Sequence, residues 1–211
     1  MGNTLRAYEH VRGIYFPIAV GVFVLVVGAL LVLLVRGARR TVPGRGSQAL
    51  LVEVVYACVL ACVAGFLVWA TFTAETPIDR TVADPGLRLK AIAAQWSWRF
   101  VYSDGVSVAD IDTWHPTPAY LPTGTEIEIT GTSEDVIHGF WIPALHYQRQ
   151  FVPGYATHFN LLFQKPGYYV GACSVLCGLN HSEMHFAVRA VSPQSFHTWL
   201  NEQHAHGGGS S

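Results

Sequence analysis

The chain has 211 residues, of which 51% are hydrophobic and 13% are charged, and its formal net charge at pH 7 is -1. This length is enough for one sizeable domain, and the positive mean hydropathy of +0.30 indicates that part of the chain lies in lipid. Because basic residues are not in excess, we expect no nucleic acid among its partners.

The first long apolar segment runs from Ile14 to Val35 and contains no charged residue. As a helix it extends about 33 Å, which is enough to cross a hydrocarbon core of about 30 Å. We therefore expect a short extracytoplasmic segment at 1–13 and a transmembrane helix at 14–35. A cleaved signal peptide is the alternative, but the apolar run is longer than is usual there and has no small-residue cleavage site.

A second charge-free segment, from Val54 to Thr73, predicts another transmembrane helix at 50–74. Trp69 lies near its far end, where an amphipathic ring favours the membrane interface. Cys58 and Cys62 lie four residues apart and therefore on one helical face, which is typical of small apolar packing between helices.

The segment between these helices, 36–49, is basic. It carries four arginines and no acidic residue: Arg36, Arg39, Arg40 and Arg45. Because positively charged loops remain on the cytoplasmic side, both ends of the chain are expected to face outward. This topology predicts an integral protein of the bacterial cytoplasmic membrane, or an equivalent respiratory membrane, with its later part on the outer, periplasmic side.

Residues 79–203 differ in character from the helical part. Short runs of strand-forming residues are separated by Pro, Gly and Asp, which indicates many short strands in a sandwich or barrel. The stretch SPQSFHTWLNEQ predicts a short helix that packs on this domain. Residues 204–211 are expected to be a flexible tail or tag remnant. The part after Thr73 is acidic, with 12 acidic and seven basic residues.

A short segment late in the domain carries four side chains that bind metals: Cys173, Cys177, His181 and Met184. Thiolate and thioether sulfurs with imidazole nitrogen favour copper, whereas zinc sites are built from Cys, His and carboxylate. The best further donor is His138, which follows the alternating run TEIEIT. Single-copper sites of the cupredoxin type use one Cys, two His and an axial Met, so this chain has a second Cys to explain.

Two other interpretations of the cysteine pair are weaker. A disulfide leaves the placement of His181 and Met184 unexplained. A structural zinc site with His181 and His185 leaves Met184 and the distant His138 unexplained.

The pattern C-x3-C-G-x2-H-x2-M, with His138 in a D-V-x-H element, resembles the copper loop of cytochrome c oxidase subunit II. The helices, the basic loop, an aromatic element and a Val152-Pro153-Gly154 turn also follow in the family's order. The resemblance implies a two-helix transmembrane hairpin followed by an all-β cupredoxin-like Greek-key barrel. It implies two copper ions, the copper A centre, with these ligands: His138, Cys173, the Val175 carbonyl, Cys177, His181 and Met184.

The resemblance also implies roles for two residues outside the copper loop. Trp96, in the run QWSWRFVY, matches the tryptophan that takes electrons from cytochrome c, with Ser97 in place of the commoner Tyr. From the residues alone, this run alternates large apolar side chains as a core strand does. Glu53 matches an acid that opens a proton-uptake path, with Tyr56 in place of Trp, although an acid there also simply reaches the aqueous interface.

Three further positions depart from the family pattern. Val175 stands where most members have a Glu whose carboxylate holds magnesium, and this argues against a magnesium site. Gln150 replaces an acid before the Pro-Gly turn, and Tyr155 replaces an Arg after it. The interface with the catalytic subunit is therefore expected to be rebuilt, as in a divergent oxidase class.

The function implied is that of subunit II in a haem-copper terminal oxidase. Electrons from cytochrome c or a similar soluble carrier would pass through copper A to haem in subunit I, where oxygen is reduced to water and protons are translocated. Because no C-x-x-C-H motif occurs, haem is expected only in the partner subunit. The chain is not catalytic alone, and further small membrane subunits are expected.

Three alternatives belong to other functional classes. The first is a membrane-anchored cupredoxin electron carrier without a catalytic partner. The others are a fragment of nitrous oxide reductase and a copper-delivery protein.

Overall fold

The computed structural model describes residues 3–37, 47–79, 84–110 and 115–207. The chain divides into a helical unit, Ala7–Glu75, and a β-rich unit formed by Thr76–Ser211 with Met1–Arg6. Residues 38–46, the greater part of the expected basic loop, lie outside the described residues.

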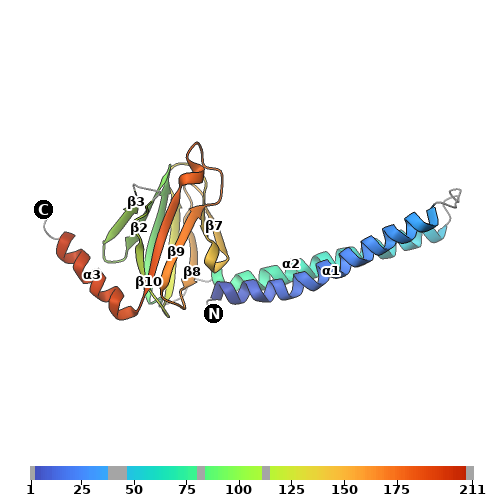
Figure 1. The fold of residues 1–211 in the computed structure, drawn as a ribbon, viewed down its shortest axis with the longest axis horizontal. Helices are drawn as coiled ribbons and strands as arrows, with labels where there is room; N and C mark the ends of the chain where they lie inside the picture. Colours follow the sequence, from blue (N-terminus) through green and yellow to red (C-terminus); the bar gives the residue numbers. More distant parts are fainter. Residues whose placement is uncertain (1–2, 38–46, 80–83, 111–114, 208–211) are drawn as a thin grey trace. The chain divides into compact units, whose positions relative to one another are not determined.

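The helical unit holds most of α1 (Asn3–Gly37) and α2 (Ser47–Asp79), labelled in Figure 1. Both helices are long and apolar enough to cross a membrane, over Thr4–Val32 and Leu51–Ala74. Apolar side chains such as that of Phe23, which is 67% exposed, cover their surfaces, and an apolar surface of this kind is typical of contact with lipid. Both helices extend beyond the spans expected at 14–35 and 50–74, into the polar residues that flank each apolar run.

A polar contact joins α1 to α2 within this unit. The hydroxyl of Tyr15 donates a hydrogen bond to the carbonyl of Leu67 at 2.9 Å, and it lies 2.5 Å from Thr71 Oγ1. Thr71 Oγ1 also donates to the Leu67 carbonyl, at 3.0 Å. These polar atoms are therefore satisfied inside the helix pair, as a lipid environment requires.

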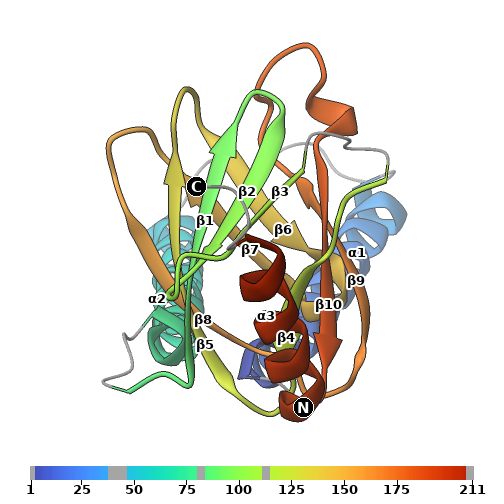
Figure 2. The ribbon, with the colours of Figure 1, turned by 90° about the vertical axis from the view of Figure 1, so that its left-hand side faces the viewer.

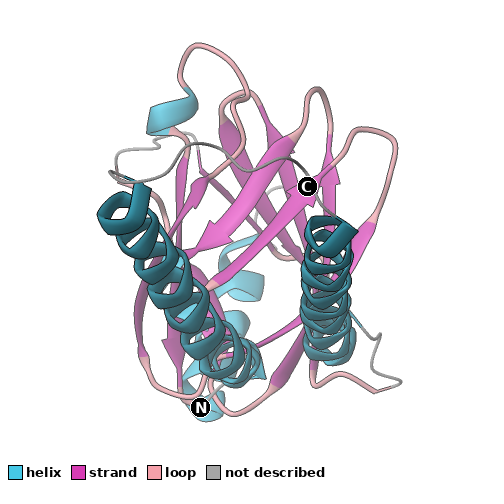
Figure 3. Ribbon diagram, turned by 90° about the vertical axis from the view of Figure 1, so that its right-hand side faces the viewer, coloured by secondary structure: helices cyan, strands magenta, loops and turns pink. Residues whose placement is uncertain are grey.

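The β-rich unit contains two five-stranded sheets, whose strands are magenta in Figure 3. The first has the order β3-β2-β1-β5-β8: β3 Ser107–Asp110, β2 Ser97–Tyr102, β1 Leu87–Ala94, β5 Glu126–Ser133 and β8 Thr157–Leu162. The second has the order β4-β10-β9-β6-β7: β4 Ala119–Pro122, β10 His185–Val191, β9 Gly167–Cys173, β6 His138–Ile142 and β7 Tyr147–Phe151. Neighbouring strands are antiparallel, except that β1 with β5 and β4 with β10 are parallel.

The core of this unit consists of side chains that alternate along the strands. In β5, for example, Ile127 and Ile129 are buried while Glu128 between them is not. Aromatic rings form much of the interior. Phe186 stacks on Phe140 with 4.6 Å between ring centroids, and the centroids of Trp98 and Phe186 are 4.9 Å apart. Aromatic pairs at such distances contribute beyond the area that they bury.

The alternation in the run QWSWRFVY predicts a single strand. In the structure, this run is instead divided between a turn and a strand. Strand β1 ends at Ala94, residues 95–96 form a tight turn, and β2 begins at Ser97, which pairs with Ala94. Trp96 therefore lies in a turn, whereas Trp98 lies in β2 and is buried. No Gly or Pro marks this turn in the sequence, so the alternation alone concealed it.

Helix α3 (Pro193–Gly207) lies beside β4, as Figure 2 shows. Ser192 caps it, since its Oγ accepts a hydrogen bond from the Ser195 N–H at 3.2 Å. The indole of Trp199 stacks on Tyr120, with ring centroids 4.8 Å apart. The helix continues past residue 203, where its end was expected, and His204 Nε2 lies 2.9 Å from Asp104 Oδ2.

Candidate metal centre

The two arms of the candidate centre are strand ends that pair with each other. His138 opens β6 and Cys173 closes β9, and the register of these strands sets Phe140 opposite Cys173. Gly139 donates its N–H to Cys173 Sγ at 3.4 Å. A side chain at 139 would overlap the Ser174 hydroxyl, since a Cβ there would lie 2.3 Å from Ser174 Oγ. Glycine is therefore needed for the arms to approach.

The sulfur and nitrogen donors predicted from the sequence converge at this point. The two cysteine sulfurs are 3.7 Å apart; His138 Nδ1 lies 3.9 Å from Cys173 Sγ, and His181 Nδ1 lies 3.6 Å from Cys177 Sγ. Met184 Sδ lies 3.8 Å from Cys177 Sγ, and the carbonyl oxygen of Val175 lies 3.2 Å from Cys173 Sγ. Each of the four other predicted donors therefore lies within 3.9 Å of one of the two cysteine sulfurs.

The alternatives for the cysteine pair do not match this geometry. A disulfide needs about 2.05 Å between its sulfurs, which is well short of the 3.7 Å observed. His185, the expected fourth ligand of a structural zinc site, instead has its Nδ1 3.0 Å from the carbonyl oxygen of Glu183.

Four of the six donors are shielded from water, whereas Val175 and His181 are partly exposed. His138 and Met184 are fully buried, and Cys173 and Cys177 are 6% and 4% exposed. Burial by itself raises the pKa of Cys173, but the His138 imidazole and the Gly139 N–H outweigh it, and the pKa falls to about 6. Burial and the neighbouring Cys173 raise the pKa of Cys177 to about 12. The pair thus loses its first proton more readily than its second, and a cation bound by both sulfurs would displace the second.

Asp135 holds His138 from the side opposite the sulfurs. Its Oδ1 lies 2.8 Å from His138 Nε2, so that Nδ1 faces the cysteines. Burial tends to lower the pKa of His138, but Cys173 and Asp135 together raise it above its ordinary value. A carboxylate on the outer nitrogen is the usual partner of a metal-binding histidine. Asp135 is the first residue of the D-V-x-H element, and its spacing of three residues from His138 is the sequence signal that could have suggested this role.

The turn that carries Trp96 contacts the segment from Cys173 to Met184, the candidate metal-binding loop. The side chain of Gln95 donates from Nε2 to the carbonyl of Cys177 at 2.6 Å. The ring of Trp96 lies against Gly178, where an added Cβ would be 3.2 Å from the nearest ring atom. Gly178 has φ +124, a conformation that favours glycine. The structure thus brings Trp96 to the metal centre, whereas Glu53 lies exposed on α2 in the helical unit.

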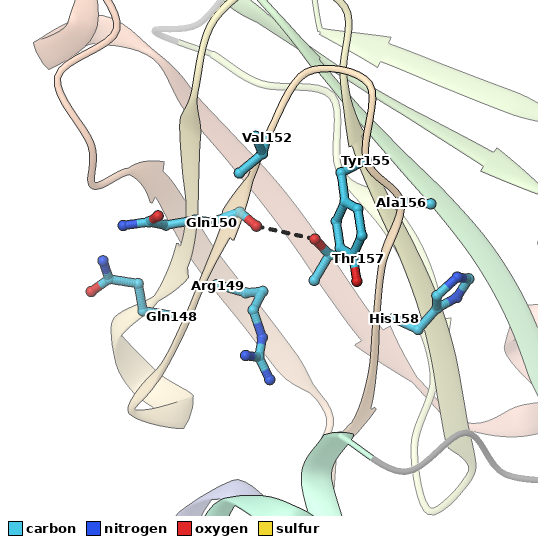
Figure 4. A pocket seen from close by; sticks show the side chains of 8 residues that line it. All are labelled: Gln148, Arg149, Gln150, Val152, Tyr155, Ala156, Thr157 and His158. Atoms are coloured by element: carbon cyan, nitrogen blue, oxygen red, sulfur yellow. Dashed lines mark hydrogen bonds between the residues drawn. The ribbon is translucent and has the colours of Figure 1, made fainter.

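A separate cavity of about 750 Å³ lies between β7 and β8. Figure 4 shows its lining, which includes Gln150 and Tyr155, the two positions that depart from the family pattern around the Pro-Gly turn. The Thr157 hydroxyl donates to the carbonyl of Gln150 at 3.3 Å across this cavity, the dashed line in Figure 4. No acidic side chain is among the described residues that line it.

Comparison with known proteins decides the family. The family model described as cytochrome c oxidase subunit II, periplasmic domain, matches residues 115–191. Cytochrome c oxidase subunit 2 of Wickerhamomyces canadensis is 31% identical over 174 residues, which cover 72% of this chain and 69% of that protein. The chain belongs to the cytochrome c oxidase subunit II family.

Other subunit II proteins match over different lengths. The Yarrowia lipolytica protein is 36% identical over 142 residues, or 58% of this chain and 59% of that one. The mitochondrial protein of Vigna unguiculata is 27% identical over 209 residues, or 90% of this chain. This chain spans 59% and 56% of these two relatives, less than two thirds of either.

A solved structure of the subunit II family agrees with the fold. The periplasmic domain of subunit II of cytochrome oxidase from Bradyrhizobium japonicum is 26% identical, with a TM-score of 0.55. The match covers 60% of this chain and 99% of that one. The expected fold class is thereby confirmed: two apolar helices followed by a cupredoxin-like β domain.

The donor set fits the copper that is typical of the subunit II family. The ligand atoms of His138, Cys173 and Cys177 all lie within 4.8 Å of one another, and all three residues are buried. Two thiolates, two imidazoles and a thioether are soft or intermediate donors, and the thioether favours copper over zinc.

Proposed function

We propose that this chain is subunit II of a haem-copper terminal oxidase and that its β-rich unit relays electrons through two copper ions. The observation that carries the proposal is the pair of cysteine sulfurs, 3.7 Å apart, with one imidazole nitrogen beside each. A single-copper carrier needs only one thiolate, so it leaves the second buried cysteine without a purpose.

Each donor has a part in this proposal. Cys173 and Cys177 would hold the copper ions through their thiolates, with His138 and His181 as the imidazole ligands. Met184 and the carbonyl of Val175 would complete the donor set. The bound copper pair supplies a reservoir in which a single electron is shared. Asp135 keeps the His138 imidazole in the tautomer that presents Nδ1 to the metal.

The chain's own residues also suggest where electrons arrive. Trp96 lies half-buried in the β1–β2 turn against the metal-binding loop, which supports it as the residue that takes electrons from a soluble donor. The acidic balance of the domain favours a donor with a basic face, such as cytochrome c, and predicts an encounter rate that falls with salt. Haem belongs to the partner, subunit I, which carries out the oxygen chemistry, and further small membrane subunits complete the assembly.

The helical unit supports membrane anchoring of this subunit. In the proposed topology, α1 and α2 span the bacterial cytoplasmic membrane, or an equivalent respiratory membrane, and the β-rich unit lies on the outer side. Glu53 then lies at the cytoplasmic edge of α2 and opens the proton-uptake path of the complex. Val175 offers no carboxylate, so we propose that this chain supplies no magnesium ligand there.

Copper analysis with electron paramagnetic resonance tests the central proposal. We expect the reconstituted full chain to bind two copper ions and to show the hyperfine pattern of two equivalent nuclei sharing one unpaired electron. Zinc at the site, or the pattern of a single copper nucleus, would overturn the dinuclear centre. Gentle detergent extraction tests the assembly: we expect a haem-containing subunit to copurify, and a stable lone polypeptide would contradict it.

A further inference from the structure

The β1–β2 turn is fastened to both arms of the metal centre through one residue, Gln95. Its backbone N–H donates to Asp135 Oδ2 at 2.6 Å, and Oδ1 of the same carboxylate lies 2.8 Å from Nε2 of His138. Its side-chain amide donates to the carbonyl of Cys177 at 2.6 Å. Gln95 therefore links strand β6, through Asp135, with the loop that follows β9.

The neighbouring indole has no comparable attachment of its own. Trp96 Nε1 is buried and has no hydrogen-bond acceptor in the described part of the chain. Its ring instead rests on Gly178, where the absence of a Cβ allows contact with the backbone. Gln95 Nε2 borders the same spot, since a Cβ on Gly178 would lie 2.9 Å from it. The place of the indole thus depends on packing and on the bonds of the preceding residue.

We propose that Gln95 is a positioning residue that holds the indole of Trp96 against the metal-binding loop. Its amide acts on the carbonyl of Cys177 and not on the sulfur, and its backbone bond to Asp135 does not depend on the side chain. Backbone bonds from Cys173 to Met184 (2.9 Å) and from Ser174 to Gly139 (3.0 Å) hold the metal donors in place without the amide. The consequence for electron transfer rests on the proposed function, in which electrons arrive at Trp96. A displaced indole then lowers the limiting rate of copper reduction about tenfold, since small misplacements of reacting partners have effects of this size or larger.

Two variants remove the amide donor in different ways. Gln95→Glu keeps the shape but can no longer donate to the Cys177 carbonyl, and Gln95→Ala removes the group altogether. Gln164→Glu is the matched control, because Gln164 is exposed in the β8–β9 loop and the substitution brings the same charge. The full chain is labelled with fluorotryptophan, and fluorine resonances are recorded on the copper-loaded, reduced protein. The Trp96 line is assigned as the one lost in Trp96→Phe.

We expect the Trp96 line to shift and broaden in both Gln95 variants and to stay in place in Gln164→Glu. Copper content and the hyperfine pattern should be unchanged in all three. The limiting rate at saturating donor should fall about tenfold in the Gln95 variants alone. A Trp96 line that stays in place in both Gln95 variants overturns the proposal.

The failure of the proposed function gives a different result. If the Trp96 line moves but neither the Gln95 variants nor Trp96→Phe lowers the rate, Gln95 does position the indole and electrons do not arrive there. A wild-type chain without the dinuclear pattern rejects the copper assignment, while the resonance of the reduced protein still reports whether Gln95 holds Trp96.

Discussion

The two ends of the β-rich unit bury different kinds of side chain. At the end formed by the β9–β10 loop, the interior holds two thiols, a thioether and the imidazole of His138. Toward the other end, α3 packs aromatic rings: Trp199 stacks on Tyr120, and the Tyr102 hydroxyl donates to the Tyr120 carbonyl at 2.8 Å. Buried polar donors cost stability unless they have partners, whereas buried rings contribute to it. In the proposed function one end binds a metal and the other stabilises the fold, so substitutions at the two ends should have different effects.

The largest effect is expected for Cys173→Ser at the metal end. Losing one of two bridging sulfurs should abolish the signal of a shared electron, because a hydroxyl does not replace a thiolate as a ligand for two copper ions. Copper analysis and paramagnetic resonance on the full chain measure this. Cys62→Ser on α2 is the control and should keep the signal. A dinuclear signal that survives in Cys173→Ser would contradict the assignment of the metal site to this end of the unit.

The corresponding substitution at the α3 end is Trp199→Ala. Removing a half-buried indole from its stack on Tyr120 should lower the free energy of unfolding by about 2 kcal/mol, less than for a fully buried Trp. Thermal unfolding in detergent, followed by near-ultraviolet circular dichroism, measures the change. The copper spectrum should stay as in the wild type, and an altered spectrum would mean that the ends are coupled.

An effect of similar size is expected for Asp135→Asn, which weakens the partner of His138 without touching a metal donor. Losing such a partner typically lowers metal affinity about 10–100-fold. Competition with a copper chelator measures this affinity. Glu134→Gln is the control: Glu134 pairs with Arg99 at 2.6 Å, and we expect the chelator titration to be unaffected. Equal affinities in both variants would count against a role for the carboxylate.

The smallest effect is expected for Tyr102→Phe, which removes one hydrogen bond worth about 1 kcal/mol. Burial raises the pKa of Tyr102 well above its ordinary value, although its bond to Tyr120 opposes the rise. As pH rises past about 10, the unfolded chain ionises this phenol and the folded chain does not. Stability should therefore fall with alkaline pH, and less steeply in Tyr102→Phe. Identical slopes in denaturant titrations would contradict this.

Much of the candidate site was predictable because its chemistry is local in the sequence. The spacing of Cys173, Cys177, His181 and Met184 confines four donors to one loop, and His138 follows a recognisable strand pattern. The structure brings these donors together with the Val175 carbonyl. The two helices were predictable for a similar reason, since each contains a long run without charge.

The features that the sequence did not predict depend on contacts between distant segments, or on a turn that lacks the Gly or Pro typical of turns. The turn at Gln95 and Trp96 lacks Gly and Pro, and its place follows from the pairing of β1 with β2. The bond between Gln95 and Asp135 exists only because β1 lies parallel to β5. Helix α3 continues to Gly207, into the expected tail, where His204 meets Asp104.

The pairing of β6 with β9 has a consequence for the order in which the protein matures. His138 and Cys173 are far apart in the sequence and meet only after these strands have found each other. Before that, the chain can offer a metal the donors of the short segment from Cys173 to Met184 but not His138 beside them. Contacts of such sequence separation form slowly. Metal acquisition should therefore follow chain collapse, and an ion captured earlier would be held by an incomplete set of ligands.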